Sequence, residues 1–129
     1  MYRTTVNGGE HPCEAVIRPA GDRYVLVEFG PNVLDLDLRF RAHGLKARLE
    51  EDQPPGVIDL TPGIRSLQVH YDPRKLAARE LISELRRALD DLPPIDDLEV
   101  PTRIVHLPLS WDDPALRETS DQYTPRVRH

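Results

Sequence analysis

Apolar and polar side chains alternate in several short stretches of the chain, which is typical of β-strands with one buried face. Residues 24–29 (YVLVEF) are rich in β-branched and aromatic side chains and are followed by Gly30-Pro31, so they are predicted to form a strand that ends there. Residues 14–18 (EAVIR) are predicted to form a short edge strand that ends at Pro19.

Two further strand-like stretches lie in the middle of the chain. Residues 57–61 (VIDLT) and 64–71 (IRSLQVHY) are predicted to be strands joined by a corner at Pro62-Gly63. The apolar positions of the second stretch do not all alternate, so a bulge is predicted near Ser66.

Residues 36–51 are predicted to form a helix. Alternate residues near the start of this stretch are apolar, as in a strand, but the helical period extends further and ends at the stop signal QPPG. Gly44 lowers the helix propensity by about 1 kcal/mol relative to alanine. The apolar positions on the helical face are Leu34, Leu38, Leu45 and Leu49.

A second helix is predicted after Asp72-Pro73, with Asp72 as its N-cap and proline at its first position, and it ends near Leu92. Residues 99–109 (EVPTRIVHLPL) are then predicted to form a last strand, in which proline marks an edge or a bulge. A short helix is predicted over residues 114–123.

This order of elements predicts an α+β fold with the ferredoxin-like split βαβ arrangement (βαββαβ). The expected structure is an antiparallel sheet with two helices on one face and a short C-terminal tail. The predicted division of the chain is an N-terminal extension with an edge strand (1–20), a ferredoxin-like lobe (21–110) and the truncated start of another lobe (111–129).

The composition excludes several classes of protein. A length of 129 residues predicts one domain, with 39% hydrophobic and 30% charged residues as in soluble globular proteins. A formal net charge of −5 and few aromatic residues argue against a nucleic-acid partner. No apolar run reaches the roughly 20 residues of a membrane span. The single cysteine, Cys13, cannot form an internal disulfide, so a cytoplasmic protein is predicted.

Few residues have a pattern that indicates chemistry. His70 and His106 both lie in predicted strands and would suit proton transfer or metal binding if they were neighbours, but no third ligand has a characteristic spacing. We expect them more often to be surface or core-edge residues. Asp35 and Asp37 are interpreted in the same way, as solvated positions of an amphipathic element rather than as a carboxylate pair.

Arg65 follows the proline-glycine corner in the stretch TPGIRS. An arginine at such a position can bind a carboxylate or phosphate through two parallel hydrogen bonds. The alternative is a structural pair with a nearby acid such as Asp59. From the residues alone, no self-sufficient active site is predicted.

Three stretches of the sequence resemble the carboxyltransferase region of urea carboxylase. They are EHPCEAVIRPAGDRYVLVEFGPNVLDLDLRFRAH, PGVIDLTPGIRSLQVHYDPRKL and EVPTRIVHLPLSWDDPALRE. GDRYVLVEFG and PGIRSLQVHYDP are also similar to a broader family. It includes the B-type component of 5-oxoprolinase, which is often labelled allophanate hydrolase subunit 1, and a histidine-kinase inhibitor protein. The stretch HLPLSWDDPALRE favours the urea carboxylase branch.

The resemblance implies the N-terminal lobe of a carboxyltransferase, which moves a carboxyl group from carboxybiotin to urea and gives allophanate. It implies that biotin and ATP serve the complete enzyme, and that this lobe alone binds no cofactor and is inactive. The implied partners are the remaining carboxyltransferase lobes or a partner subunit, and a biotin carrier domain. A component of an ATP-dependent amide hydrolase and a non-catalytic kinase-inhibitor module are the alternatives.

The resemblance also suggests where a docking surface and site residues would lie. An exposed apolar surface is expected around Leu107, Leu109 and Trp111, where the following lobe would dock. Arg65 and His106 are the candidate site residues at this lobe junction, because they lie in the two most specific motifs.

Overall fold

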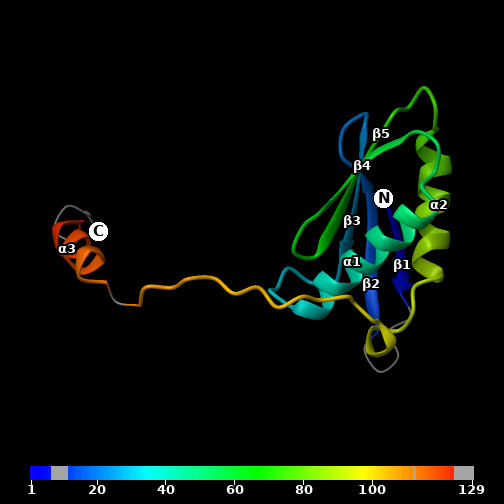
Figure 1. Ribbon diagram of the computed structural model, residues 1–129. Coiled ribbons are helices and arrows are strands. Elements are labelled where there is room, and N and C mark those ends of the chain that lie inside the picture. The colour runs from blue at the N-terminus through cyan, green and yellow to red at the C-terminus, as the bar shows by residue number, and fades with distance from the viewer. Residues whose placement is uncertain (7–11, 112, 124–129) are drawn as a thin grey trace. The chain divides into compact units, whose positions relative to one another are not determined.

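The computed structural model describes residues 1–6, 12–111 and 113–123. It separates into two compact units, Met1–Glu99 and Val100–His129. The first unit contains a five-stranded antiparallel sheet in the order β1-β2-β3-β5-β4 (Figure 1). The strands are β1 (Tyr2–Val6), β2 (Cys13–Pro19), β3 (Tyr24–Phe29), β4 (Val57–Pro62) and β5 (Ser66–Tyr71).

Two helices of the first unit, α1 (Leu36–Glu51) and α2 (Ala78–Asp90), pack on one face of the sheet (Figure 1). A short 3₁₀ helix, η1 (Ile95–Asp97), follows them, and α3 (Pro114–Tyr123) lies in the second unit. The predicted α+β class, the antiparallel sheet and the two helices on one face are therefore confirmed. The predicted strand at 24–29 and the predicted helices at 36–51 and 114–123 have the expected bounds.

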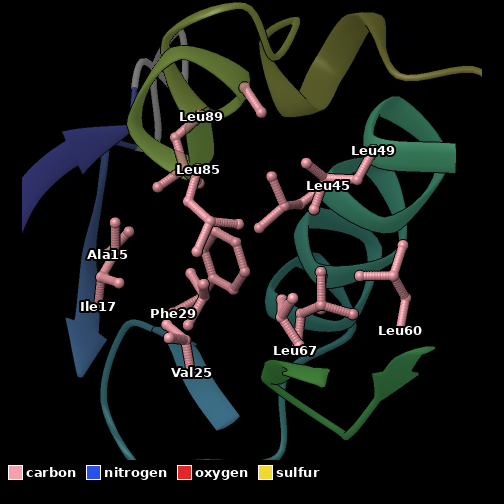
Figure 2. Packing of buried hydrophobic residues seen from close by; sticks show 14 of the residues in the cluster. Ala15, Ile17, Val25, Phe29, Leu45, Leu49, Leu60, Leu67, Leu85 and Leu89 are labelled. Atoms are coloured by element: carbon pink, nitrogen blue, oxygen red, sulfur yellow. The ribbon is translucent and has the colours of Figure 1, made fainter. Parts of the chain in front are cut away.

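The core lies between this sheet face and the two helices. Alternation along β3 buries Val25, Val27 and Phe29 completely. Figure 2 shows strand side chains meeting leucines of both helices, including Leu45 of α1 and Leu85 of α2. Burial of these side chains is the main source of stability for the first unit.

The predicted strand at 99–109 is wrong. Within the described residues, the stretch 99–109 belongs to no helix or strand. The element just before it is η1. The sheet position beside β3 is filled instead by β2, which pairs with β3 from Ala15↔Phe29 to Pro19↔Val25. β2 buries Ala15 and Ile17 against the helices. The position expected for the last strand of the βαββαβ order is therefore occupied by a strand that precedes β3 in the sequence.

β1 was not predicted, because its sequence YRTTV has no apolar alternation and Val6 is its only residue buried in the core. It pairs with β2 from Tyr2↔Ile17 to Val6↔Cys13. The predicted N-terminal extension (1–20) thus contains two of the five strands. The strand predicted at 14–18 is β2, but it lies between β1 and β3 and not at the edge of the sheet.

The bulge lies in β4 rather than near Ser66. The register shifts between Val57 and Asp59, which leaves Ile58 as the exposed extra residue. The physical reason is spacing, since Val57 and Leu60 both pack on the core although they are three residues apart.

The second helix begins later than predicted. Asp72 accepts hydrogen bonds from the backbone N–H groups of Arg74, Lys75 and Leu76 and forms a turn, which buries Leu76 in the core. α2 starts only at Ala78, where the Glu80 side chain accepts from the Ala77 N–H at 3.2 Å. A proline after an aspartate therefore marked a turn, not the first turn of a helix. None of the described helices is both long and apolar enough to cross a membrane.

Candidate functional site

Glu28 joins two arginines on the sheet face that α1 and α2 leave open. Because side chains alternate along β3, Glu28 points away from the core that Val27 and Phe29 enter. Its carboxylate accepts from Arg18 Nε at 2.7 Å and from Arg65 Nη2 at 3.0 Å. One carboxylate thus holds two guanidinium groups, and this cluster has an excess of positive charge.

Arg65 makes further hydrogen bonds to the loop after β3. Its guanidinium donates to the Gly30 carbonyl at 3.3 Å and to Asn32 Oδ1 at 3.4 Å. The expectation that an acid pairs with Arg65 is met by Glu28 and not by Asp59, which accepts from the Thr61 hydroxyl at 2.7 Å. Arg65 therefore connects the β4–β5 corner to the loop that leads into α1.

The two candidate histidines lie in different surroundings. His70 is on β5 and stacks on Tyr24 of β3, with ring centroids 4.5 Å apart and 17° between the ring planes. His106 is exposed in the stretch after η1, which is not a strand, so the expected neighbouring-strand pair does not form. In the part of the chain that the structure describes, no group of three histidine, cysteine, aspartate or glutamate residues could hold a metal ion.

A cavity of about 480 Å³ lies where the starts of β2 and α1 meet the end of β3. Asp35 and Asp37 both line it, and both are exposed, in keeping with their interpretation as solvated positions. Asp35 also caps α1, since its carboxylate accepts from the Asp37 N–H at 2.9 Å. The full lining is Pro12, Cys13, Glu14, Gly30, Pro31, Asp35, Asp37, Leu38 and Arg41.

Arg41 and Cys13 are the buried polar side chains of this cavity. Arg41 is only 4% exposed and lies on the buried face of α1. Burial raises the pKa of the Cys13 thiol, and the charge of Arg41 and a backbone hydrogen bond from Gly30 offset only part of this rise. The thiol is therefore protonated at neutral pH and is a poor nucleophile.

The cavity does not suit ATP or carboxybiotin. Three carboxylates, those of Glu14, Asp35 and Asp37, face one guanidinium in its lining. A triphosphate, or the carboxylate of carboxybiotin, would be repelled by this excess of negative charge.

The second unit has a different kind of surface. Five large apolar side chains within residues 104–111 are between 57% and 86% exposed. They are Ile104, Val105, Leu107, Leu109 and Trp111. The expected exposed apolar surface around Leu107, Leu109 and Trp111 is therefore confirmed.

Glu28 and Arg41 were missed from the sequence, although each left a signal. Glu28 is a charged residue inside a strand whose alternate positions are apolar, so a partner on the open face was to be expected. Arg41 is three residues after Leu38 and four before Leu45, which places it on the buried helical face.

Comparison with known proteins identifies relatives of this chain. The profile of the family described as carboxyltransferase domain, subdomain C and D, matches residues 15–121. Urea amidolyase of Saccharomyces cerevisiae is 26% identical over 115 residues, and that of Lachancea kluyveri is 29% identical over 111 residues. These matches cover 89% and 86% of this chain and 6% of each relative, so the chain spans a small part of their length.

A solved structure is also similar. The crystal structure of the Kluyveromyces lactis urea carboxylase aligns with a TM-score of 0.64 and 26% identity. The alignment covers 70% of this chain and 8% of that one.

Proposed function

The chain belongs to the carboxyltransferase domain family, subdomain C and D, and on that premise we propose that it is the N-terminal lobe of a urea carboxylase-type carboxyltransferase. In this function a carboxyl group leaves carboxybiotin and forms a bond to a nitrogen of urea. The bond between the carboxyl group and the biotin nitrogen breaks, the proton lost by the urea nitrogen ends on that biotin nitrogen, and the products are allophanate and biotin. The lobe acts only together with the remaining lobes.

The observation that carries this proposal is the exposed apolar surface of residues 104–111. A soluble protein rarely leaves five large apolar side chains exposed within eight residues unless another surface covers them. In the first unit, large apolar side chains are buried between the sheet and the two helices, although Leu34, Leu36 and Ile64 are exposed there. We assign the docking surface to residues 104–111 because five exposed apolar side chains lie within eight residues there.

The candidate residues take different roles at the proposed lobe junction. His106 lies among the exposed apolar side chains, so a lobe that covers them would bring its imidazole to the interface. Arg65 is a positioning residue, since its donors are bound to Glu28, Gly30 and Asn32 and fix the loop before α1.

The cofactors of the complete enzyme bind outside this lobe in our proposal. The acidic lining of the cavity supports this assignment, because ATP and carboxybiotin are both anionic. A biotin carrier domain would bring the carboxyl group to the junction, and ATP would be consumed at a separate site.

Reconstitution tests the proposed function. The purified chain is combined with the biotin carboxylase, the biotin carrier and the remaining carboxyltransferase lobes of its own urea carboxylase. We expect urea-dependent ATP hydrolysis and allophanate formation only in the complete mixture. Activity that does not depend on this chain would refute the proposal. Turnover of 5-oxoproline with a partner subunit, or inhibition of a histidine kinase, would instead assign the chain to an alternative branch.

Two substitutions test the site residues within that assay. His106→Ala is expected to lower kcat at least tenfold if the imidazole lies at the junction, whereas Arg103→Ala in the same exposed stretch serves as its control. Arg65→Ala is expected to raise KM more than it lowers kcat, because it loosens a loop rather than removing a reacting group. Unchanged kinetics in both variants would exclude Arg65 and His106 from the site.

A further inference from the structure

The two edge strands of the five-stranded sheet differ in how they are protected from further pairing. β4 has a bulge at Ile58 and ends at Pro62, and both features discourage the addition of another strand. β1 pairs with β2 over all five of its residues without a register shift, and it contains no proline or glycine. Among the residues that the structure describes, no strand pairs with the outer side of β1. β1 is therefore the unprotected edge.

The hydrogen bonds between β2 and β3 show which way the backbone groups of β2 point. The N–H of Gly30 donates to the carbonyl of Glu14 at 2.9 Å, and the N–H of Ala20 donates to the carbonyl of Tyr24 at 2.9 Å. Successive residues of a strand direct their backbone groups to opposite sides. The even-numbered residues of β2 therefore bond to β3, and its odd-numbered residues bond to β1.

This alternation fixes which groups of β1 face outward. The odd-numbered residues of β2 are opposite Tyr2, Thr4 and Val6, so these three residues use their backbone groups within the chain's own sheet. The N–H and C=O groups of Arg3 and Thr5 then point away from β2. Both residues are exposed, and in the described part of the chain no other strand bonds to them. β1 thus offers two donors and two acceptors to a further strand.

The side chains of β1 do not protect the edge either. A charged side chain often keeps other strands away from an edge. Arg3 is the only charged residue of β1, and it is paired with Glu14 of β2 at 3.0 Å. Tyr2 is opposite the buried Ile17, so its ring lies on the helix side of the sheet, where it is still 46% exposed. α2 therefore leaves this end of the edge uncovered.

Independently of the proposed function, we propose that β1 is a self-association edge, at which β1 of a second copy adds antiparallel to form one continuous sheet. A two-fold axis through Thr4 aligns all five residues and places Arg3 opposite Thr5 of the second copy. Each of the two Arg3–Thr5 pairs then exchanges two backbone hydrogen bonds. Tyr2 lies opposite Val6, and such an aromatic–β-branched pair stabilises a sheet.

The strand itself favours a second copy as the occupant, because the same five residues form both halves of the contact. With the axis at Thr4, no like charges are opposite each other, whereas an axis at Arg3 would oppose two arginines and align fewer residues. The helices of both copies lie on the same side of the combined sheet. The contact is small, so we expect a weak dimer that forms as the concentration rises.

Amide exchange at two concentrations tests the pairing. The ¹⁵N-labelled chain is measured at about 20 µM and about 1 mM, and sedimentation gives its mass at both concentrations. The amides of Arg3 and Thr5 are expected to exchange at least threefold more slowly at the higher concentration. The amides of Thr4 and Val6 are expected to be protected equally at both, because they bond to β2. Equal exchange of Arg3 and Thr5 at both concentrations, or a monomer at the higher one, would overturn the proposal.

Two substitutions at Thr5 give matched variants. Thr5→Pro removes one outward N–H from each copy and is expected to weaken the dimer at least tenfold. Thr5→Val keeps the N–H and is expected to change the dissociation constant less than about threefold. The chain's own sheet does not use this N–H, so both variants should keep the urea midpoint of the unsubstituted chain at low concentration. A dimer of unchanged affinity in Thr5→Pro would overturn pairing at β1.

Disulfide cross-linking tests the position of the axis and leaves the backbone groups in place. Thr4→Cys brings two thiols opposite each other at the axis, within the reach of a disulfide, so oxidised glutathione is expected to link the copies. In Thr5→Cys the two thiols are out of register, and at least fivefold less linking is expected. Both variants also carry Cys13→Ala, so that no other thiol reacts. Equal linking of the two variants would overturn the axis at Thr4, and no linking of either would overturn self-association at β1.

Discussion

β3 and residues 103–109 share one feature of a strand but have opposite surroundings. Both stretches have apolar side chains at every second position (Val25, Val27 and Phe29; Val105, Leu107 and Leu109). β3 is paired on both edges, by β2 and β5, and its inward side chains are fully buried. Within the part of the chain that the structure describes, no strand pairs with residues 103–109, and their apolar side chains are exposed.

The difference teaches that alternation predicts the capacity to form a strand and not the presence of a partner. β3 has partners on both edges within its own unit, and the hairpin of β1 and β2 fills the sheet position that residues 99–109 were expected to take. Once that position is filled, the later stretch has no place beside β3. Its apolar side chains then stay exposed unless another surface covers them.

The largest contrast should come from one aromatic residue in each region. Phe29→Ala is expected to lower the free energy of unfolding by about 3–5 kcal/mol, because it removes a fully buried ring. Trp111→Ala is expected to change it by less than about 0.5 kcal/mol, since Trp111 is 86% exposed. Urea denaturation of both variants measures this. Similar losses would show that Trp111 is buried in solution, and the contrast between the regions would fail.

Two glycines test how tightly the first unit is packed near the cavity. Gly30 has a φ of +57°, and a Cβ added there would lie 2.9 Å from Leu38 Cδ2. Gly30→Ala is expected to cost about 2–4 kcal/mol, from the left-handed backbone and from overpacking together.

Gly21→Ala is the matched control, because Gly21 has a φ of +84° but nothing lies within 4 Å of its added Cβ. Its expected cost is about 1–2 kcal/mol, from the backbone alone. Both values come from thermal or urea denaturation. Equal costs would mean that Leu38 moves aside freely, and that the packing around the cavity is loose.

The Glu28 cluster should contribute less than the core. Glu28→Gln is expected to lower stability by about 1–2 kcal/mol, a value reduced for the partial exposure of Arg18 and Arg65. Glu50→Gln removes an exposed pair with Lys46 and should cost less than about 0.5 kcal/mol. Denaturation at low salt and in about 1 M salt compares them, because salt screens exposed pairs. A larger loss for the Glu50 variant would contradict the assigned role of Glu28.

The sequence was sufficient for the elements whose signals are local. α1 was predicted from its helical period although Gly44 opposes helix formation. An added Cβ at Gly44 would lie 3.5 Å from Leu98 Cδ1, which is an ordinary van der Waals contact, so the packing there does not require a glycine. The start of α2 was misjudged, because the signal at Asp72 fits a turn as well as an N-cap.

Features that depend on distant residues could not be predicted from one sequence. Nothing local to residues 99–109 shows that β2 takes the neighbouring position of β3. Asp59 was only one example of a nearby acid that could pair with Arg65, whereas the observed partner, Glu28, lies 37 residues away in the sequence. The cavity combines the start of β2, the end of β3 and α1, and its lining was therefore visible only in the fold.

The smallest expected effect is a pH dependence that only the first unit shows. Because burial raises the pKa of the Cys13 thiol in the folded chain, the unfolded chain loses this proton first as the pH rises. The unfolded state then binds fewer protons, so this contribution to stability is complete below the ordinary thiol pKa and declines above it. Between pH 7.5 and about 9.5 the decline should reach up to about 1 kcal/mol. Cys13→Ala should lack it, and urea denaturation of both proteins under reducing conditions measures the difference. Parallel pH profiles would show that the thiol is not shielded from water, and that the packing around Gly30 and Leu38 is more open than the structure shows.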